Sequence, residues 1–190
     1  MHLVSVTHKV WCGELNIDLQ TVASAKAGSS ESFSLLYEQV QDELYKYALY
    51  TLGNAHDAED AVADTFVEAW RGISNLRDEA AFKAWIFRIL SVRMKRKIAD
   101  LIKRKNTLNI ADFVSDFTAD TDIERETSDK VIVLGALGKL SNQERMIVVL
   151  SAIQGYTTRE ISEMLGCPHG TVSSKLHRAL IKMRKMIEMG

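Results

Sequence analysis

Four carboxylates recur at helical spacing in the first half of the chain, and together they have the chemistry to bind a basic partner. The intervals between them are three, four and four residues, so a helix places all four on one face. The four are Asp57, Asp60, Asp64 and Glu68. Acids in the first turn of a helix interact favourably with its dipole, but that effect does not reach the last two. The spacing therefore indicates one exposed acidic face.

A polar and basic stripe near the C-terminus has the chemistry to contact phosphates and bases. Its members are separated by four, three and four positions. On the expected helix they lie on a different side from the apolar residues. They are Thr171, Lys175, Arg178 and Lys182. His169 lies near the start of the same helix, where it either reaches a base edge or stays a solvated surface histidine.

The segment before this stripe carries the signals of a helix, a turn and a second helix. Thr157 and Glu160 match a capping box, in which hydroxyl and carboxylate satisfy the first amides of a helix. Gly166 makes the turn, and Pro168 suits the first turn of the next helix because its missing N–H needs no partner there. The pattern is typical of a helix-turn-helix, whose second helix can enter the major groove of DNA. An ordinary helical hairpin with solubilising lysines is the alternative.

Signals for catalysis or metal binding are missing from the sequence. Cys167 and His169 lie close together, but no further Cys/His cluster completes four ligands, so we expect no zinc site. The chain has no glycine-rich phosphate loop, no HExxH and no ExxH partners for the acids of a di-iron bundle. Cys12 and Cys167 are too distant in sequence to form a framework, so we expect free thiols in a reducing compartment. We therefore expect a protein without a cofactor that is not an enzyme.

The elements that must position these residues are helices, because 190 residues include one proline and ten glycines. We expect an all-α fold with two small helical domains. In the first, helices run from about Gly28–Ser32 to Gly53, from Asn54 to Gly72, and from near Asp78 into a basic run. In the second, helices cover Val131–Leu137, follow the capping boxes at Ser141 and Thr157, and begin near Pro168. The expected boundaries are a disordered extension at 1–16, a first domain at 17–105, a flexible acidic linker at 106–129 and a second domain at 130–190.

Charge is segregated along the chain. Residues 31–80 carry eleven acidic and three basic residues, whereas residues 81–105 carry nine basic and one acidic residue. This alternation favours separate surfaces for a basic and an acidic partner, although solvated helix faces would produce it too. The apolar runs are far shorter than the ~20 residues of a membrane span, and the N-terminus lacks the pattern of a secretory signal. We expect a cytoplasmic protein without membrane insertion.

The two helical segments resemble the bacterial RNA polymerase sigma factors of the extracytoplasmic-function (ECF) type, which keep only the helical regions 2 and 4. FSLLYEQVQDELYKYAL, DAEDAVADTFVEAWRGI and FKAWIFRIL are similar to successive parts of region 2. LGKLSNQERMIVVLSAIQGYTTREISEMLGCPHGTVSSKLHRALIKMRK is similar to region 4. The resemblance covers roughly residues 18–186, in the family's order. It implies a three-to-four-helix bundle for region 2 and a helix-turn-helix bundle for region 4, joined by a flexible linker.

The resemblance also implies three binding surfaces. Core polymerase would bind through its β′ clamp and β flap, with the clamp on Asp57, Asp60, Asp64 and Glu68. Contacts to the minus-ten element would come from Arg77, Asp78, Trp85, Phe87, Arg88, Arg93 and Arg96. Contacts to the minus-thirty-five element would come from Arg159, His169, Gly170, Thr171, Ser173, Ser174, Lys175 and Arg178. Trp85 is equally well explained as a core residue, and Phe82 fits the core better than a stacking role.

Three positions depart from the commonest family pattern. An asparagine commonly stands in place of Val92, an acid in place of Arg96, and an arginine or lysine in place of Ser173. The implied function is promoter recognition and opening as a non-catalytic subunit of the polymerase, with an anti-sigma protein as a further partner. The alternative is a dimeric helix-turn-helix regulator that binds palindromic DNA without polymerase.

Overall fold

The computed structural model describes residues 17–104 and 128–188, which contain helices and no strand. The expected all-α fold with two helical bundles is therefore confirmed. The extension at 1–16 and most of the expected linker lie outside the described residues. Within the described part of the chain, no helix is both long and apolar enough to cross a membrane.

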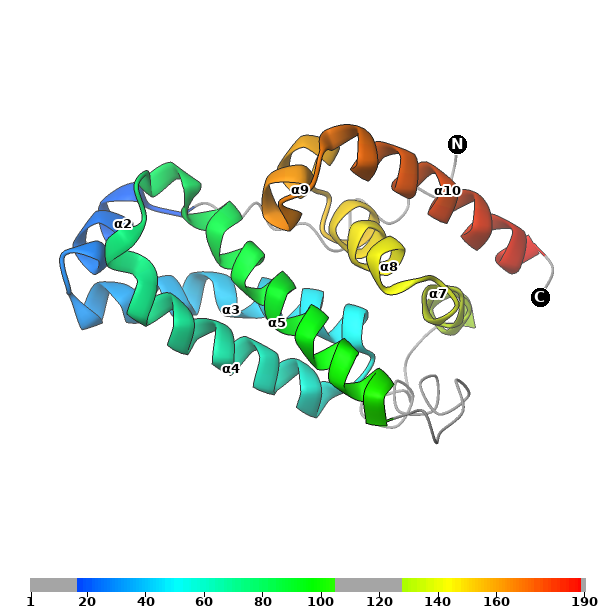
Figure 1. Ribbon diagram of the computed structural model, residues 1–190, viewed down its shortest axis with the longest axis horizontal. Coiled ribbons are helices and arrows are strands. Elements are labelled where there is room, and N and C mark those ends of the chain that lie inside the picture. The colour runs from blue at the N-terminus through cyan, green and yellow to red at the C-terminus, as the bar shows by residue number, and fades with distance from the viewer. Residues whose placement is uncertain (1–16, 105–127, 189–190) are drawn as a thin grey trace.

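The first bundle is built around three long helices that lie side by side (Figure 1). They are α3 (Ser30–Leu52), α4 (Ala55–Gly72) and α5 (Phe82–Arg104). Gly53 closes α3 with a φ of 77°, and the Asn54 side chain then accepts the amide of Asp57 at 2.9 Å to start α4. These local signals end one helix and begin the next within two residues. They bring α4 back along α3 and so fix which face of α4 is buried.

A short helix that the sequence reading did not predict precedes α3. This helix, α2 (Leu19–Lys26), starts at Asp18, whose carboxylate accepts the amides of Gln20 and Thr21 at 3.2 and 3.0 Å. The hydrogen bonds from Thr21 and Gln20 lower the pKa of the Asp18 carboxyl. The signal was present, since an N-capping aspartate followed by LQTVASAK is a helix start.

The start of the third long helix differs from the expectation by four residues. The carboxylate of Asp78 accepts the amide of Ala80 at 3.0 Å and caps a short 3-10 turn, η2 (Glu79–Ala81), before α5 begins at Phe82. Another turn, η1 (Ile73–Asn75), follows α4. Lys26 of α2 pairs with Glu79, which ties the first helix to the turn that leads into α5.

The second bundle consists of α7 (Ser128–Gly138), α8 (Asn142–Val148), α9 (Thr158–Leu165) and α10 (His169–Glu188). A π-helical turn, η4 (Val149–Ile153), continues α8. Both expected capping boxes are present, at Ser141 with Glu144 and at Thr157 with Glu160. Gly166 ends α9 with a φ of 61°, and α10 follows as the second helix of a helix-turn-helix.

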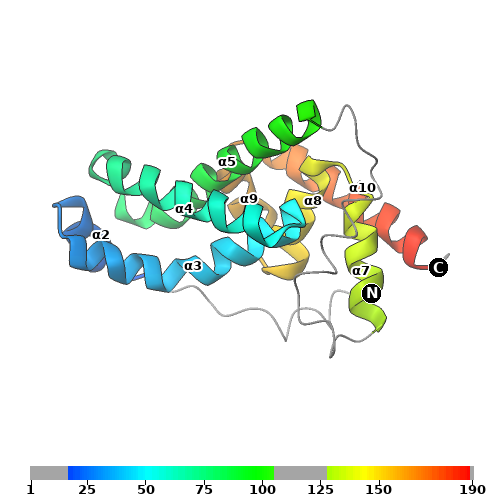
Figure 2. The same cartoon turned by 90° about the horizontal axis from the view of Figure 1, so that it is seen from below.

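The two bundles are packed against each other along one side. Helix α9 lies against α5, while α8 and η4 lie against α3, as the two orthogonal views show (Figures 1 and 2). Buried apolar side chains of both bundles belong to one continuous cluster. The bundles therefore share part of their core, an arrangement that the expectation of two separately exposed surfaces did not include.

Candidate functional site

The four acids of α4 form one acidic face, as their spacing predicted, and this face lies beside α5. Lys97 Nζ lies 3.0 Å from Asp57 Oδ1 and 2.9 Å from Asp60 Oδ2. Arg93 donates from Nε to Glu68 Oε2 at 2.7 Å, and its Nη1 lies 4.0 Å from Asp64 Oδ2. Four carboxylates therefore share two cations from α5, and the face keeps an excess of negative charge.

The pairing between α4 and α5 favours the charged forms of Asp60 and Lys97. The hydrogen bond from Lys97 and its positive charge lower the pKa of the Asp60 carboxyl. Burial alone would lower the pKa of Lys97, but its hydrogen bonds to Asp60 and Asp57 raise it. The side chains of Asp60 and Asp64 are 54% and 66% exposed, so both remain accessible to a basic partner.

Exposed apolar side chains adjoin the acids on α4, and the sequence reading did not single them out. Val67 and Trp70 are both exposed although they are large and apolar, and so is Tyr37 on α3. Trp70 packs edge-on against Phe33 at 5.0 Å between ring centroids, which fixes its indole at the surface. The sequence carries a signal for this exposure, because Val67 and Trp70 fall outside the buried face of α4, which is formed by Ala58, Ala61, Val62, Thr65, Phe66 and Ala69. Acidic and apolar groups side by side are typical of a protein-binding surface.

The residues expected at the minus-ten element are divided between the surface and the core. Arg77, Asp78, Arg88 and Arg96 are exposed. Trp85 is partly buried and packs on Phe82 at 6.0 Å between centroids, while Phe82 is a core residue. Arg93, as described, is bound to the acidic face.

Phe87 requires a correction, because it is fully buried and has no face to offer to a base in this arrangement. Its ring lies 5.8 Å from Tyr47 of α3 and 5.5 Å from Tyr156, which precedes α9. Phe87 lies on the side of α5 that the second bundle covers. The cause is therefore packing between the two bundles, which the local sequence pattern around Phe87 does not reveal.

The helix-turn-helix presents several of the expected DNA-reading residues at its surface. Arg159, His169, Gly170 and Ser174 are exposed. His169 Nε2 and Thr158 Oγ1 are 2.8 Å apart, so the imidazole is tied to the start of α9. Ser173 is partly buried. Arg178 is exposed, and its Nε donates to the Ser174 carbonyl at 3.1 Å.

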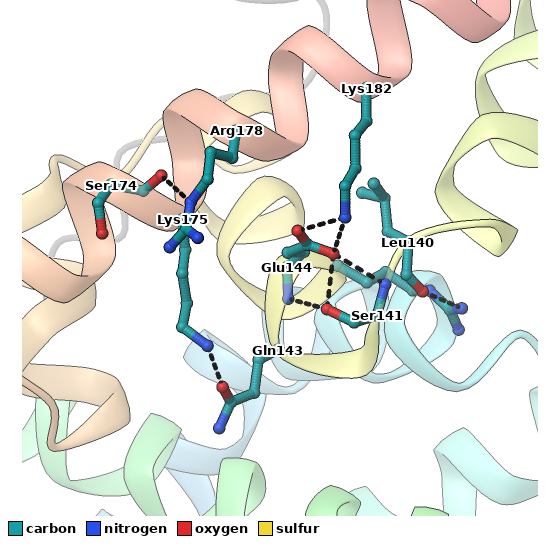
Figure 3. A network of polar contacts seen from close by, with 9 residues as sticks. Leu140, Ser141, Gln143, Glu144, Ser174, Lys175, Arg178 and Lys182 are labelled. Atoms are coloured by element: carbon teal, nitrogen blue, oxygen red, sulfur yellow. Dashed lines mark hydrogen bonds and ion pairs between the residues drawn. The ribbon is translucent and has the colours of Figure 1, made fainter.

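Two members of the polar stripe on α10, Lys175 and Lys182, turn toward α8 (Figure 3). Lys175 donates to the side-chain carbonyl of Gln143, and Lys182 Nζ lies 2.8 Å from Glu144 Oε1. Hydrogen bonds from Lys182 and then Ser141 lower the pKa of the Glu144 carboxyl to about 2. The stripe is therefore split, with Arg178 pointing outward and two lysines paired within the bundle.

A small hollow of about 70 Å³ separates the N-terminal part of α10 from α5. Its lining includes Lys95 of α5, Gln143 of α8, Cys167 of the turn, and Thr171 and Lys175 of α10. Lys95 of the basic helix α5 therefore lies across this hollow from two of the residues expected to contact DNA, Thr171 and Lys175.

Comparison with known proteins gives a consistent result for both bundles. Residues 36–106 match the family described as Sigma-70 region 2, and residues 130–183 match Sigma-70, region 4. The chain is 29% identical to the ECF RNA polymerase sigma factor SigM of Mycobacterium tuberculosis, over 90% of this chain and 84% of that protein. It is 28% identical to SigL of the same species, over 88% of this chain and 95% of that protein. A solved structure of CnrH in complex with the cytosolic domain of CnrY has 26% identity and a TM-score of 0.69, covering 90% of this chain and 97% of that chain.

Proposed function

The chain belongs to the ECF RNA polymerase sigma factors, and we propose that it binds core polymerase through the acidic face of α4 and promoter DNA through α5 and α10. As a sigma factor it directs core polymerase to promoters and takes part in transcription initiation. Sigma factors are initiation factors and not enzymes in themselves, because RNA synthesis belongs to the core polymerase. The match to both regions in order leaves no observation that favours a dimeric helix-turn-helix regulator.

The acidic face of α4 is the observation that carries the proposal for polymerase binding. Asp57, Asp60, Asp64 and Glu68 present four carboxylates against two cations, and Asp60 and Asp64 keep more than half of their side chains accessible. A basic partner such as the β′ clamp helices would gain charge pairing at the face and apolar contact at Trp70. Region 4 would make a second contact at the polymerase β flap.

Promoter opening is assigned to the loop before α5 and to the exposed side of α5. Arg77, Asp78, Arg88 and Arg96 are accessible there, and Trp85 is partly exposed. Cations that neutralise phosphates and aromatic faces that stack on bases are the requirements of single-stranded DNA. Phe87 is buried and is not among the proposed DNA contacts. Arg93 is assigned to the acidic face, where it pairs with Glu68 and Asp64.

Recognition of the minus-thirty-five element is assigned to the helix-turn-helix. The N-terminal part of a recognition helix usually reaches the base edges in the major groove. The proposed contacts are Arg159, His169, Gly170, Thr171, Ser173, Ser174, Lys175 and Arg178. Lys175 has to exchange its hydrogen bond with Gln143 for one with DNA, whereas Arg178 already points outward.

The proposal includes an anti-sigma protein as a further partner and the cytoplasm as the place of action. The similar solved structure is that of CnrH in complex with the cytosolic domain of a second protein, CnrY. The structural similarity to CnrH covers 90% of this chain. That likeness extends over both bundles, so it supports a partner that binds the packed form of the chain.

Transcription from purified components tests the proposal. The full chain is mixed with core polymerase and genomic promoter fragments, and binding to core is measured by co-migration in size-exclusion chromatography. The double variant Asp60→Ala/Asp64→Ala should lose core binding at least tenfold, because each close charge pair contributes on the order of 1 kcal/mol or more at a protein interface. Glu59→Ala removes an exposed acid of α4 outside the acidic face and should bind like the unmodified chain. Equal core binding by all three proteins would overturn the assignment of the acidic face.

A further inference from the structure

We propose that Lys26 of α2 is a positioning residue for promoter opening, because its ion pair with Glu79 holds the loop that leads into α5. We call residues 77–81, which connect η1 to α5, the strand loop. The inference rests on the proposed function, which assigns two residues of the strand loop to the minus-ten element. It extends that function to α2, which precedes the residues 36–106 that match the family.

The strand loop lies at the surface and is not held by burial of its own side chains. Leu76 before it and Phe82 after it are buried, with 8% and 1% of each residue exposed. Between these two anchors, Glu79 alone is partly buried, and the other four residues of the strand loop are exposed. Polar contacts therefore decide where the loop lies between its two ends.

The ion pair between Lys26 and Glu79 joins the strand loop to α2, which lies beside the turn into α5 (Figure 1). A hollow of about 550 Å³ lies next to the pair, lined on one side by α2 and on the other by residues 78–80. The side chains of Lys26 and Glu79 are 19% and 35% exposed, so the pair is partly shielded from water. The hydrogen bond from Lys26 lowers the pKa of the Glu79 carboxyl, so the acid stays charged at neutral pH. Because the hollow leaves the loop room to move, the pair sets the distance between the loop and α2.

Helix α2 gives the ion pair a firm base. Val22 and Ala25 of α2 are buried in the core of the first bundle. Lys26 directly follows Ala25 and lies in the last turn of α2, where a cation interacts favourably with the helix dipole. The lysine side chain therefore starts from a backbone that core packing holds in place, and its ammonium group passes this restraint to the strand loop.

Loss of the pair should weaken the binding of a DNA strand by the loop. Apparent affinity falls by the fraction of time that the loop spends in its binding-competent position. A partly exposed ion pair shifts such an equilibrium about twofold to fivefold. Glu79→Ala gives a test of sign, because it removes a negative charge close to a polyanion. A charge effect alone would tighten strand binding by this variant, whereas lost positioning weakens it.

Hydrogen exchange in the full chain measures the positioning directly. In Lys26→Met and in Glu79→Ala, the hydrogen-bonded amides of the strand loop should exchange about twofold to fivefold faster than in the unmodified chain. The double variant Lys26→Glu/Glu79→Lys rebuilds the pair in reverse and should return most of the slow exchange. Lys46→Met and Glu38→Ala alter exposed residues of α3 and should exchange as the unmodified chain does. Unchanged exchange in both single variants of the pair would overturn the inference.

Strand binding tests whether the position of the loop is used. The probe is a pool of labelled single DNA strands with a randomised central stretch, mixed with the full chain and core polymerase, and the bound strands are sequenced. Lys26→Met and Glu79→Ala should bind the pool about twofold to fivefold more weakly and select bases less sharply, and the double charge swap should recover both. Tighter binding by Glu79→Ala would refute the positioning role, because it would show a charge effect alone.

Core binding and thermal unfolding separate positioning from a general loss of structure. The pair contains no residue of the acidic face, so all variants should co-migrate with core polymerase as the unmodified chain does. A parallel loss of core binding and of melting temperature would assign Lys26 to overall stability and so contradict the inference.

The outcomes also separate the inference from the proposed function. If the unmodified chain binds neither core polymerase nor the strand pool, the proposed function fails, and hydrogen exchange still decides whether Lys26 positions the loop. If the unmodified chain binds both and the variants of the pair match it, the inference fails and the proposed function stands.

Discussion

Replacing Arg145 by methionine should destabilise the second bundle more than any other single arginine substitution in the described part of the chain. The guanidinium is almost completely buried, with 5% of the residue exposed, and burial lowers its pKa to about 10. It donates to the carbonyls of Leu137 and Gly138 at 2.9 Å each, of Leu140 at 3.2 Å and of Thr51 at 3.0 Å. Three of these four acceptors belong to the C-terminal end of α7 and the turn after it, where helical carbonyls lack partners. The Arg145 side chain therefore caps the C-terminal end of α7 and also donates a hydrogen bond to the C-terminal end of α3.

The expected loss follows from the acceptors that the substitution leaves behind. A buried polar group without a partner costs about 1–3 kcal/mol. Four carbonyls lose the guanidinium together, although that of Leu137 keeps the amide of Leu140 at 3.1 Å. Burial of the methionine side chain and partial entry of water offset some of this cost. Removing one side of a buried charged network typically costs about 3–5 kcal/mol, and we expect Arg145→Met to fall in that range. Arg145→Lys should lose less, because lysine keeps the charge but has fewer donors.

Urea unfolding with two probes measures this loss and shows where it acts. All three tryptophans, at positions 11, 70 and 85, precede residue 105, so fluorescence reports on the first half while far-UV circular dichroism reports on both. The dichroism transition should therefore move more than the fluorescence transition. Arg184→Met is the control, since Arg184 is mostly exposed and pairs with Glu188 of its own helix, a contact worth about 0.3–0.5 kcal/mol. A loss below about 1 kcal/mol for Arg145→Met would refute the reasoning.

Three further predictions concern the second bundle. Gly166→Ala should lower stability by about 1 kcal/mol or more in thermal unfolding, because φ is 61° and the new Cβ would press on Arg88; an unchanged melting temperature would contradict this. Because Glu144 has its pKa lowered from 4.5 to about 2, its ionisation stabilises the fold above pH 4.5, and this contribution is lost as the pH falls toward 2. Acid unfolding of Glu144→Gln should therefore be less steep between pH 4.5 and 2 than that of the unmodified chain, and identical profiles would exclude the Lys182 pairing as the cause. Arg178→Ala should weaken duplex binding and reduce the slope of log affinity against log salt by about 1, as measured by anisotropy titrations; an unaltered slope would show that Arg178 contacts no phosphate.

Local signals were sufficient to predict most helix boundaries of this protein. The capping boxes at Ser141 and Thr157 and the glycine cap at Gly53 depend on residues within one helical turn, so the sequence shows them directly. The same kind of signal at Asp18 marks α2, which the sequence reading passed over. The third long helix was expected to start near Asp78, but Asp78 caps a 3-10 turn that precedes α5, and a cap residue alone does not distinguish a 3-10 turn from an α-helix.

The sequence by itself determined that the four acids of α4 share a face, because a helix repeats every 3.6 residues and needs no other part of the chain to do so. Only the tertiary structure decided that Arg93 and Lys97 pair with those acids, that Phe87 is covered, and that Lys175 turns toward Gln143. Tyr156 and its acceptor Glu43 are 113 positions apart, and no local pattern encodes such a pair. Contacts of this kind form where two bundles bury their remaining apolar surface together, so they depend on the shape and charge of both bundles at once.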